Sequence, residues 1–331
     1  MCAVSAEPDL LAVADRTDAA ETLLLVTHIH PDGDGLGAMI ALSNAASQRG
    51  KTVQLYLPEG APERYAFLIE GRNCIGDDQL AEAAAVAEAI VVLDTSSQSQ
   101  LEAAWPVLQK HAERTVVIDH HLGSGPIGQV GWVDTAACSV GLMVQELLEQ
   151  LAWPICEDSA RALAVAIASD TGWMRFENTD ARCLRALARL LDIGVRPDQL
   201  YSRLFQADRP QRLALQARAL ESIELHAEEK IGTMQLLAAD FEKTGARSDE
   251  TENLVNELLR VPQVEVAIML IENGGNIRVN LRSRGSVDVS AIARKFGGGG
   301  HARAAGLRNQ TPLPELKNQL LAEACQALAE A

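Results

Sequence analysis

The first half of the chain alternates short, β-branched apolar runs with longer Ala-rich stretches. The runs have the length and composition of buried strands, and the Ala-rich stretches are long enough to form helices. Alternation of this kind predicts βαβ units, and hence a largely parallel sheet with helices on both faces, an α/β fold. We expect strands over residues 23–26, 53–57, 90–93, 116–118 and 129–133, and helices that include residues 37–49, 79–88 and 99–111.

The length of 331 residues exceeds a comfortable single core and predicts two domains. Residues 1–195 contain the βαβ pattern followed by helices, and residues 196–229 read as a helical linker that Pro210 interrupts. Residues 230–331 form a smaller α/β domain, with strands expected at 232–236, 264–271 and 277–281, a helix at 250–260, and a terminal helix that opens at Pro314.

Charge restricts the classes of partner. The chain has 29 Lys and Arg against 45 Asp and Glu, a net charge of −16, so it lacks the cationic surface that a protein gripping long duplex nucleic acid needs. A small anionic substrate in a local pocket stays compatible with this charge.

The cellular setting is predicted from the cysteines and the apolar runs. The six cysteines show no metal-binding spacing, and residues 1–20 lack a secretion signal, so free thiols in a reducing cytoplasm are expected. No apolar run approaches the roughly 18 residues that span a bilayer, so no membrane association is expected. The oligomeric state stays open, a homodimer included. The cysteines are Cys2, Cys74, Cys138, Cys156, Cys183 and Cys325.

Several of the predicted apolar segments deliver acidic and imidazole side chains to the loops that follow them. Open parallel sheets place their sites at the carboxyl ends of the strands, so these side chains are expected to converge. Four carboxylates and two imidazoles form a donor set too hard for a thiolate-type zinc site and large enough for two divalent cations, with Mn²⁺ favoured and Mg²⁺, Co²⁺ or Zn²⁺ as alternatives. The predicted ligands are His28, Asp32, Asp34, Asp94, His120 and Asp170.

Each acid also has a purely structural interpretation. Asp32 and Asp34 suit a turn or a helix N-cap, Asp94 suits a turn at a strand end, and Asp170 suits the opening of the turn at Thr171. The metal-site prediction therefore depends on the common placement of these residues after apolar segments.

The second domain contains a basic, glycine-rich stretch inside an acidic chain. Six Lys and Arg residues against one acid occupy residues 278–303, which predicts an anion site. Four successive glycines at 297–300 are costly to order, and they predict a loop that cradles a ligand with its backbone N–H groups.

These motifs together resemble the DHH phosphoesterases that carry a DHH-associated C-terminal domain. The likeness extends over nearly the whole chain and, within the superfamily, is greatest to the two-domain bacterial nanoRNases, which are bifunctional oligoribonucleases and pAp phosphatases. The motifs are residues 28–34, Asp94, Asp119-His120-His121, residues 168–172 and residues 298–301.

The resemblance implies a bimetal hydrolase that releases mononucleotides from short single-stranded RNA and dephosphorylates 3′-phosphoadenosine 5′-phosphate (pAp). One ion would be held by His28, Asp32 and Asp94, the other by Asp34, Asp94, His120 and Asp170, and Asp94 would bridge them. A water bridging the cations would lose its proton and attack phosphorus in line.

The resemblance also assigns residues around the metals. Asp119 would orient an imidazole, and His121 would stabilise or protonate the substrate phosphate. Residues that would bind substrate in the second domain are Arg282, Ser283, Gly298, Gly299, Gly300 and His301.

The sequence does not exclude three other functions. The same motifs are compatible with a phosphodiesterase for cyclic dinucleotides or linear pApA, with a manganese-dependent inorganic pyrophosphatase, and with a non-catalytic nucleotide-binding or RNA-binding module. The last class is disfavoured, because an idle domain has no physical reason to keep four mutually repelling carboxylates.

Overall fold

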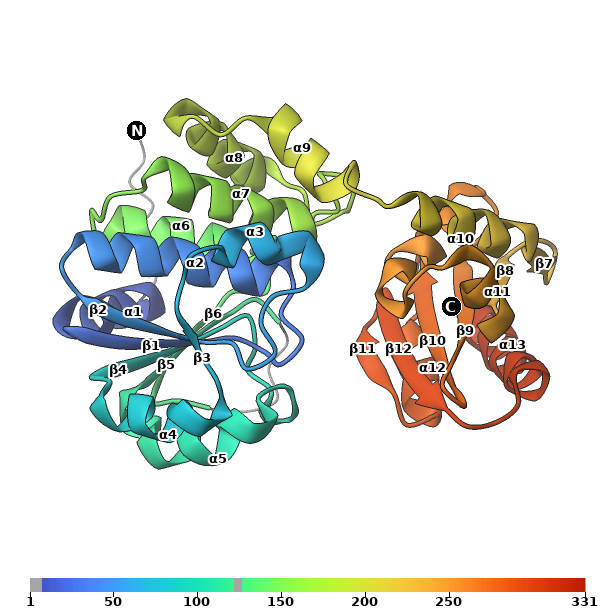
Figure 1. Ribbon diagram of the computed structural model, residues 1–331, viewed down its shortest axis with the longest axis horizontal. Helices are drawn as coiled ribbons and strands as arrows, with labels where there is room; N and C mark the ends of the chain where they lie inside the picture. The colour runs from blue at the N-terminus through green and yellow to red at the C-terminus, as the bar shows by residue number, and fades with distance from the viewer. Residues whose placement is uncertain (1–7, 122–126, 331) are drawn as a thin grey trace. The chain divides into compact units, whose positions relative to one another are not determined.

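The chain divides into two units between Ala207 and Asp208. The computed structural model describes residues 8–121 and 127–330, without the side chains of Pro8, Asn273 and His301 (Figure 1). Within the predicted linker 196–229, α9 (Pro197–Phe205) belongs to the first unit, and α10 (Pro210–Glu221) and β7 (Glu224–His226) belong to the second.

The first unit is built on a six-stranded, entirely parallel sheet in the order β3-β2-β1-β4-β5-β6. This order confirms the predicted α/β class. The short β3 escaped prediction because two residues give no periodic signal. The strands are β1 (Thr22–Val26), β2 (Thr52–Tyr56), β3 (Cys74–Ile75), β4 (Ala89–Leu93), β5 (Thr115–Asp119) and β6 (Val130–Val133).

Alternate residues of the central strands enter two separate cores, one on each face of the sheet. Leu23 and Leu25 pack into the core under α2, α6 and α7, whereas Leu24 and Val26 pack into the core under α4 and α5. The helices are α1 (Pro8–Ala19), α2 (Gly33–Gln48), α3 (Ala66–Ile69), α4 (Asp77–Val86), α5 (Trp105–Leu108), α6 (Val140–Gln150), α7 (Glu157–Asp170) and α8 (Ala181–Ile193).

Two predicted helices of this unit differ from the structure. Helix α2 begins at Gly33 rather than at residue 37, because the Asp32 side chain accepts hydrogen bonds from the N–H groups of Asp34 and Gly35 and caps the first turn. The segment 99–111 forms short 3₁₀ turns around α5 rather than one helix, and His111 within it has non-helical dihedral angles.

The second unit is built on a mixed six-stranded sheet in the order β11-β12-β10-β9-β8-β7. Only β8 and β9 are parallel, and the other neighbours are antiparallel. The predicted helix 250–260 is two 3₁₀ segments, Ser248–Thr251 and Leu254–Arg260. The remaining elements are β8 (Ile231–Leu236), α11 (Ala238–Thr244), β9 (Val266–Asn273), β10 (Asn276–Ser283), α12 (Val289–Lys295), β11 (Gly299–His301), β12 (Ala304–Asn309) and α13 (Leu313–Glu330).

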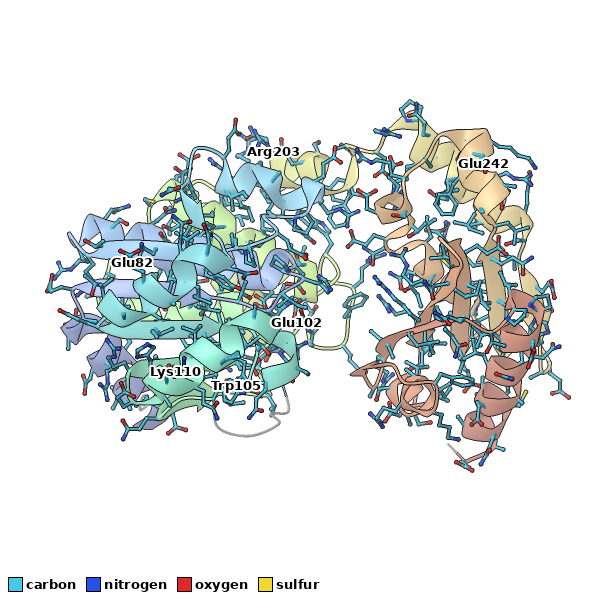
Figure 2. The ribbon with its side chains drawn as sticks, turned by 60° about the horizontal axis from the view of Figure 1, so that its bottom comes forward. Glu82, Glu102, Trp105, Lys110, Arg203 and Glu242 are labelled. Carbon is cyan, nitrogen blue, oxygen red and sulfur yellow. The ribbon has the colours of Figure 1, made fainter. Side chains whose placement is uncertain are left out.

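Both units follow the usual division between apolar cores and charged surfaces. Charged side chains such as Glu82 on α4, Lys110 after α5 and Glu242 on α11 lie on the outer surface (Figure 2). Among the residues that the structure describes, no helix is long and apolar enough to cross a membrane. Cys2 lies outside the described residues, and the other five cysteines carry free thiols.

The glycine run is partly an edge strand rather than the predicted loop. Gly299 to His301 pair with β12, and a Cβ on Gly298 would lie 2.3 Å from the Gly306 carbonyl oxygen. Gly300 has φ +135°, and a Cβ there would lie 2.5 Å from the Ala304 carbonyl oxygen. These two glycines allow close contact between backbones, whereas Gly299 has open space at its Cβ position.

We therefore expect Gly298→Ala and Gly300→Ala to destabilise the second unit by about 1–3 kcal/mol each, the usual cost of overpacking. Thermal unfolding should show melting temperatures several degrees below wild type. Gly299→Ala is the matched control and should melt close to wild type. Equal destabilisation by all three substitutions would contradict this packing explanation.

Candidate metal centre

The polar side chains predicted as ligands follow the carboxyl ends of the parallel strands, except Asp170, which ends helix α7. The chain leaves β1 and β4 towards opposite sides of the sheet, and this switch in direction is where open α/β sheets leave room for a site. His28, Asp32 and Asp34 follow β1, and Asp94 directly follows β4. Asp119 ends β5 and is followed by His120, and Asp170 ends α7.

One group of side chains forms between the loops after β1 and β4. The Nε2 atom of His28 lies 3.5 Å from Oδ2 of Asp94 and 3.8 Å from Oδ1 of Asp32. One ligand atom from each of these residues lies within 4.8 Å of the others, which is close enough to share a cation.

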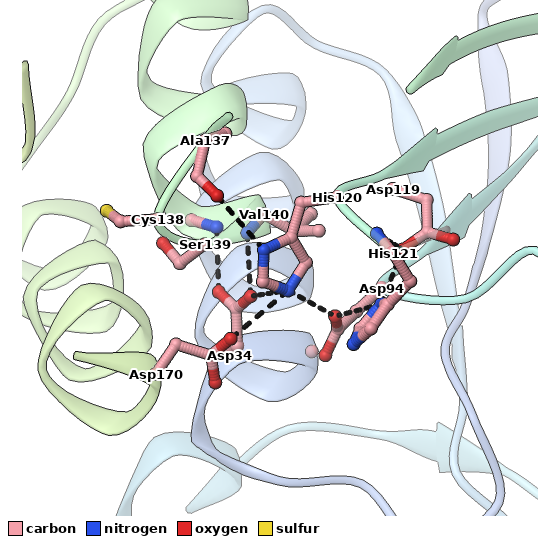
Figure 3. A network of polar contacts seen from close by, with 12 residues as sticks. Asp34, Asp94, Asp119, His120, His121, Ala137, Cys138, Ser139, Val140 and Asp170 are labelled. Carbon is pink, nitrogen blue, oxygen red and sulfur yellow. Dashed lines mark hydrogen bonds and ion pairs between the residues drawn. The ribbon is translucent and has the colours of Figure 1, made fainter. Parts of the chain in front are cut away.

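A second group adjoins the first through the other oxygen of Asp94. The Nε2 atom of His120 lies 3.1 Å from Oδ2 of Asp170, 3.8 Å from Oδ2 of Asp34 and 3.6 Å from Oδ1 of Asp94 (Figure 3). The two groups therefore meet at one carboxylate, with one oxygen of Asp94 towards each.

Asp94 is held in an unusual position. Its side chain is 2% exposed, its φ is +64°, and its Oδ1 atom is buried with no hydrogen-bond donor among the described residues. A left-handed backbone and an unsatisfied buried oxygen are both unfavourable, and they persist where the surroundings impose them. A cation between the groups would satisfy this oxygen, so the residues present fit a divalent metal.

Backbone groups hold the second set of ligands in place. The N–H groups of Val140 and Gly141, at the start of α6, donate to the two oxygens of Asp34 at 2.6 and 2.8 Å. The carbonyl of Ala137 lies 3.2 Å from Nδ1 of His120 and so turns Nε2 towards the carboxylates (Figure 3).

Asp119 contacts His121 rather than the carboxylate groups. Its Oδ1 atom lies 2.7 Å from Nδ1 of His121 and also accepts the His121 N–H at 3.1 Å. Asp119 is fully buried, whereas the side chain of His121 is 26% exposed. A buried carboxylate thus fixes the imidazole through Nδ1, and Nε2 is the ring nitrogen that Asp119 does not contact.

Crowding of carboxylates changes the proton affinities of this site. Burial and the nearby Asp170 raise the pKa of Asp34 well above its usual range, and burial and the nearby Asp34 do the same to the pKa of Asp94. Burial alone would lower the pKa of His120, but the contacts with Asp170 and Asp34 raise it to about 10. A divalent cation can replace the protons that this cluster otherwise requires.

The structure brings all the predicted first-unit residues together, and it adds backbone partners that the sequence did not indicate. Ser139 is a recognisable N-cap, since its side chain accepts the N–H of Leu142. Nothing in the sequence, however, indicates that the free N–H groups of this helix end contact Asp34, which lies 106 residues earlier.

Comparison with known proteins decides the family. The model of the DHH family N-terminal domain matches residues 22–167, and that of the DHHA1 domain matches residues 233–330. A protein of Thermus thermophilus named bifunctional oligoribonuclease and PAP phosphatase NrnA is 30% identical over 296 residues, which cover 89% of this chain and 86% of that protein. The chain belongs to the DHH family. It is therefore a metal-dependent phosphoesterase.

A second relative supports the family, and two solved structures share the fold. The Bacillus subtilis protein of the same name is 26% identical over 289 residues, covering 86% of this chain and 88% of that protein. A Bacteroides fragilis exopolyphosphatase-related protein has the same fold with a TM-score of 0.91, at 21% identity, over 100% of this chain and 98% of that one. RecJ from Thermus thermophilus has a TM-score of 0.59, at 15% identity, over 98% of this chain and 56% of that one.

The DHHA1 domain has a pocket of about 230 Å³ on one face of β10. Arg278, Asn280 and Arg282 line it from alternate positions of the strand, and acidic side chains including Glu252 line the rest. Arg282 donates to the Leu281 carbonyl and has no ion pair with any residue that the structure describes.

The other predicted substrate-binding residues of the DHHA1 domain are placed differently. Ser283 is buried, and its hydroxyl donates to the Val287 carbonyl at 2.7 Å, so its proton is already used within the turn. Gly298 to Gly300 lie at the sheet edge beside β12. The side chain of His301 lies outside the described residues.

Raised pKa values at this centre lead to a pH-dependent stability. The folded protein holds protons on Asp34, Asp94 and His120 more tightly than the unfolded chain does. The stability that this difference gives to the folded state is lost as pH rises and the three groups release their protons. We expect chelated protein to melt at lower temperature at pH 8.5 than at pH 6.5. Mn²⁺ at 100 times its Kd should restore about 2.7 kcal/mol.

Asp94→Asn should flatten this pH dependence and remove the Mn²⁺-induced rise in melting temperature, whereas Asp15→Asn, an exposed acid on α1, should change neither. A full Mn²⁺ response in Asp94→Asn would rule out a central role for this carboxylate.

Proposed function

We propose that the chain hydrolyses short single-stranded oligoribonucleotides to mononucleotides and removes the 3′-phosphate of pAp. The proposed chemistry is supported by one observation: two clusters of His and Asp side chains meet at the buried Asp94. The substrate class is supported by relatives that cover most of this chain and are named bifunctional oligoribonuclease and PAP phosphatase.

We propose His28, Asp32 and Asp94 as ligands of one divalent cation and Asp34, Asp94, His120 and Asp170 as ligands of the other. Carboxylate oxygens with only two imidazoles favour Mn²⁺ among the divalent ions, with Mg²⁺, Co²⁺ and Zn²⁺ as alternatives. When bound, the ions neutralise charge on the phosphoryl oxygens and lower the pKa of water.

The side chains that are not ligands act on the phosphate itself. With Nδ1 held by Asp119, His121 presents Nε2 as the atom that donates a hydrogen bond or a proton to a phosphate oxygen. Asp119 is then a positioning residue, because it sets the orientation of His121 without touching the substrate.

Substrate selection is proposed for the DHHA1 domain. Burial lowers the pKa of Arg282, yet an arginine stays cationic at neutral pH and binds phosphate with two parallel hydrogen bonds. Arg282, together with Gly298, Gly299, Gly300 and His301, would hold a terminal phosphate or nucleotide. The net charge of −16 makes long duplex nucleic acid a poor substrate. We also expect the protein to act in the cytoplasm.

The deciding experiment compares substrates under one condition. Purified protein with Mn²⁺ should hydrolyse 5′-labelled dinucleotides faster than progressively longer oligomers, and it should dephosphorylate pAp. Asp94→Ala should lose at least a hundredfold in kcat, because both ligand groups lose a member. Preferred turnover of cyclic di-AMP or pyrophosphate would assign the chain to another activity, and unchanged turnover by Asp94→Ala would refute the bimetal model.

Arg282→Ala should raise KM more than it lowers kcat, since it removes binding energy away from the reacting atoms. Steady-state kinetics on a dinucleotide measure this. Arg294→Ala is the matched control: Arg294 lies on α12, and its side chain, which is 60% exposed, contacts Ser290 and Asp288 instead of the pocket. A loss confined to kcat would exclude Arg282 from ground-state binding.

A further inference from the structure

The turn that follows Asp170 exposes apolar side chains beside the most polar part of the DHH domain. Phe176 is 49% exposed and Met174 is 37% exposed. Arg175 between them is also exposed and has no ion pair among the residues that the structure describes. Exposed aromatic and cationic groups next to a phosphoesterase centre call for an explanation, because metal binding and hydrolysis do not use them.

The turn is strained but firmly anchored. Trp173 and Met174 have φ values of +59° and +61°, a left-handed conformation that non-glycine residues seldom adopt. The Trp173 ring packs edge-on against the rings of Tyr201 and Phe205, with centroids 5.2 and 5.6 Å away. This aromatic cluster holds the backbone in the unfavourable conformation, so the side chains that follow Trp173 are presented in a fixed geometry.

Hydrogen bonds tie the turn to the metal centre. The Thr171 carbonyl accepts the N–H groups of Arg175 and Phe176 at 2.9 and 3.1 Å. The amide of Asn178 donates to the carbonyl of Asp170 and to that of Cys138, both at 3.1 Å. The side chain of Asn178 thus joins the end of the turn both to a predicted ligand residue, Asp170, and to the segment that leads into α6.

The Phe176 ring packs against the start of the turn, next to the residue that precedes it, Asp170. A Cβ on Gly172 would lie 2.4 Å from Cζ of Phe176, so the ring lies against Gly172, two residues after Asp170. The guanidinium of Arg175 lies 5.9 Å from the ring centroid, and its Nε donates to the Gly172 carbonyl. A nucleobase is separated from its own phosphate by a single ribose, so a base on this ring would leave its phosphate near the cations that the carboxylate groups would hold.

We propose that Phe176 stacks on a nucleobase of the substrate, with Arg175 beside it as a cation for the phosphate or the base face. The inference rests on the proposed function, since it requires a nucleotide at the metal centre. Stacking on aromatic rings is how proteins bind single-stranded nucleic acid without sequence preference. A fixed turn suits this role because little conformational freedom is lost when the base binds.

The test compares a 5′-phosphorylated ApA dinucleotide with analogues in which either base is replaced by an abasic ribose. Phe176→Ala should raise KM for the dinucleotide about tenfold, and it should leave KM unchanged for the analogue that lacks the stacked base. Phe176→Tyr and Phe176→Trp should restore the wild-type KM, and Phe176→Leu should not. A structural role alone would affect all the substrates equally.

Val86→Ala is the matched control, because Val86 is 61% exposed and precedes the first residue of β4, whereas the site lies after the last residue of that strand. It should bind all the substrates as wild type does. Phe176→Ala should also keep the Mn²⁺-induced rise in melting temperature, which shows that Asp170 is still in place. Equal KM values for wild type and Phe176→Ala on the dinucleotide would overturn the inference.

A binding measurement separates this inference from the proposed function. The fluorescence of 2-aminopurine in a non-hydrolysable dinucleotide should be quenched on binding to wild type and much less on binding to Phe176→Ala. Quenching without hydrolysis by wild type would refute the proposed function alone, and hydrolysis without Phe176-dependent quenching would refute the stacking alone. A change in sedimenting mass with unchanged base discrimination would make the patch a subunit interface and overturn the inference.

Discussion

The contacts of the buried Asp94 carboxylate are the interactions on which the arrangement of the polar centre in the first unit depends. Its two oxygens lie towards His28 on one side and His120 on the other, at 3.5 and 3.6 Å. Burial of this acid beside other carboxylates raises its pKa and would be unfavourable in a protein without a cation. Asp94 lies where β1 and β4 are neighbours in the sheet, so the loops that follow these two strands both place side chains around it.

Contacts within the protein hold the proposed ligands and His121 in fixed orientations. The first N–H groups of α6 hold Asp34, the Ala137 carbonyl orients His120, and buried Asp119 orients His121. These partners come from the end of β5, from the segment between β6 and α6, and from the first residues of α6. Preorganisation of this kind keeps the ligands from rearranging during the reaction, which is how protein sites stabilise developing charge.

The two glycine-related features of the chain have different physical origins. Gly298 and Gly300 allow the backbone of β11 to lie against β12, so part of the glycine run serves the sheet itself. Gly172 instead makes room for the ring of Phe176, which lies against it. A glycine-rich motif therefore needs its tertiary neighbours before its role can be assigned, since glycine allows both close packing and ligand contact.

The sequence by itself determined the α/β class, the strands of the parallel sheet other than β3, and the clustering of His28, Asp32, Asp34, Asp94 and His120, because the ends of parallel strands meet at one edge. Asp170 was predicted as a further ligand, but it ends helix α7, and its contact with His120 depends on how that helix packs. It could not show that residues 99–111 break into short turns or that the glycine run joins a sheet, and it left open whether Asp32 caps helix α2. Those outcomes depend on capping and on backbone contacts with remote segments. Only the tertiary structure decided which backbone groups hold Asp34 and His120, because hydrogen bonds between residues far apart in the chain leave no periodic signal in the sequence.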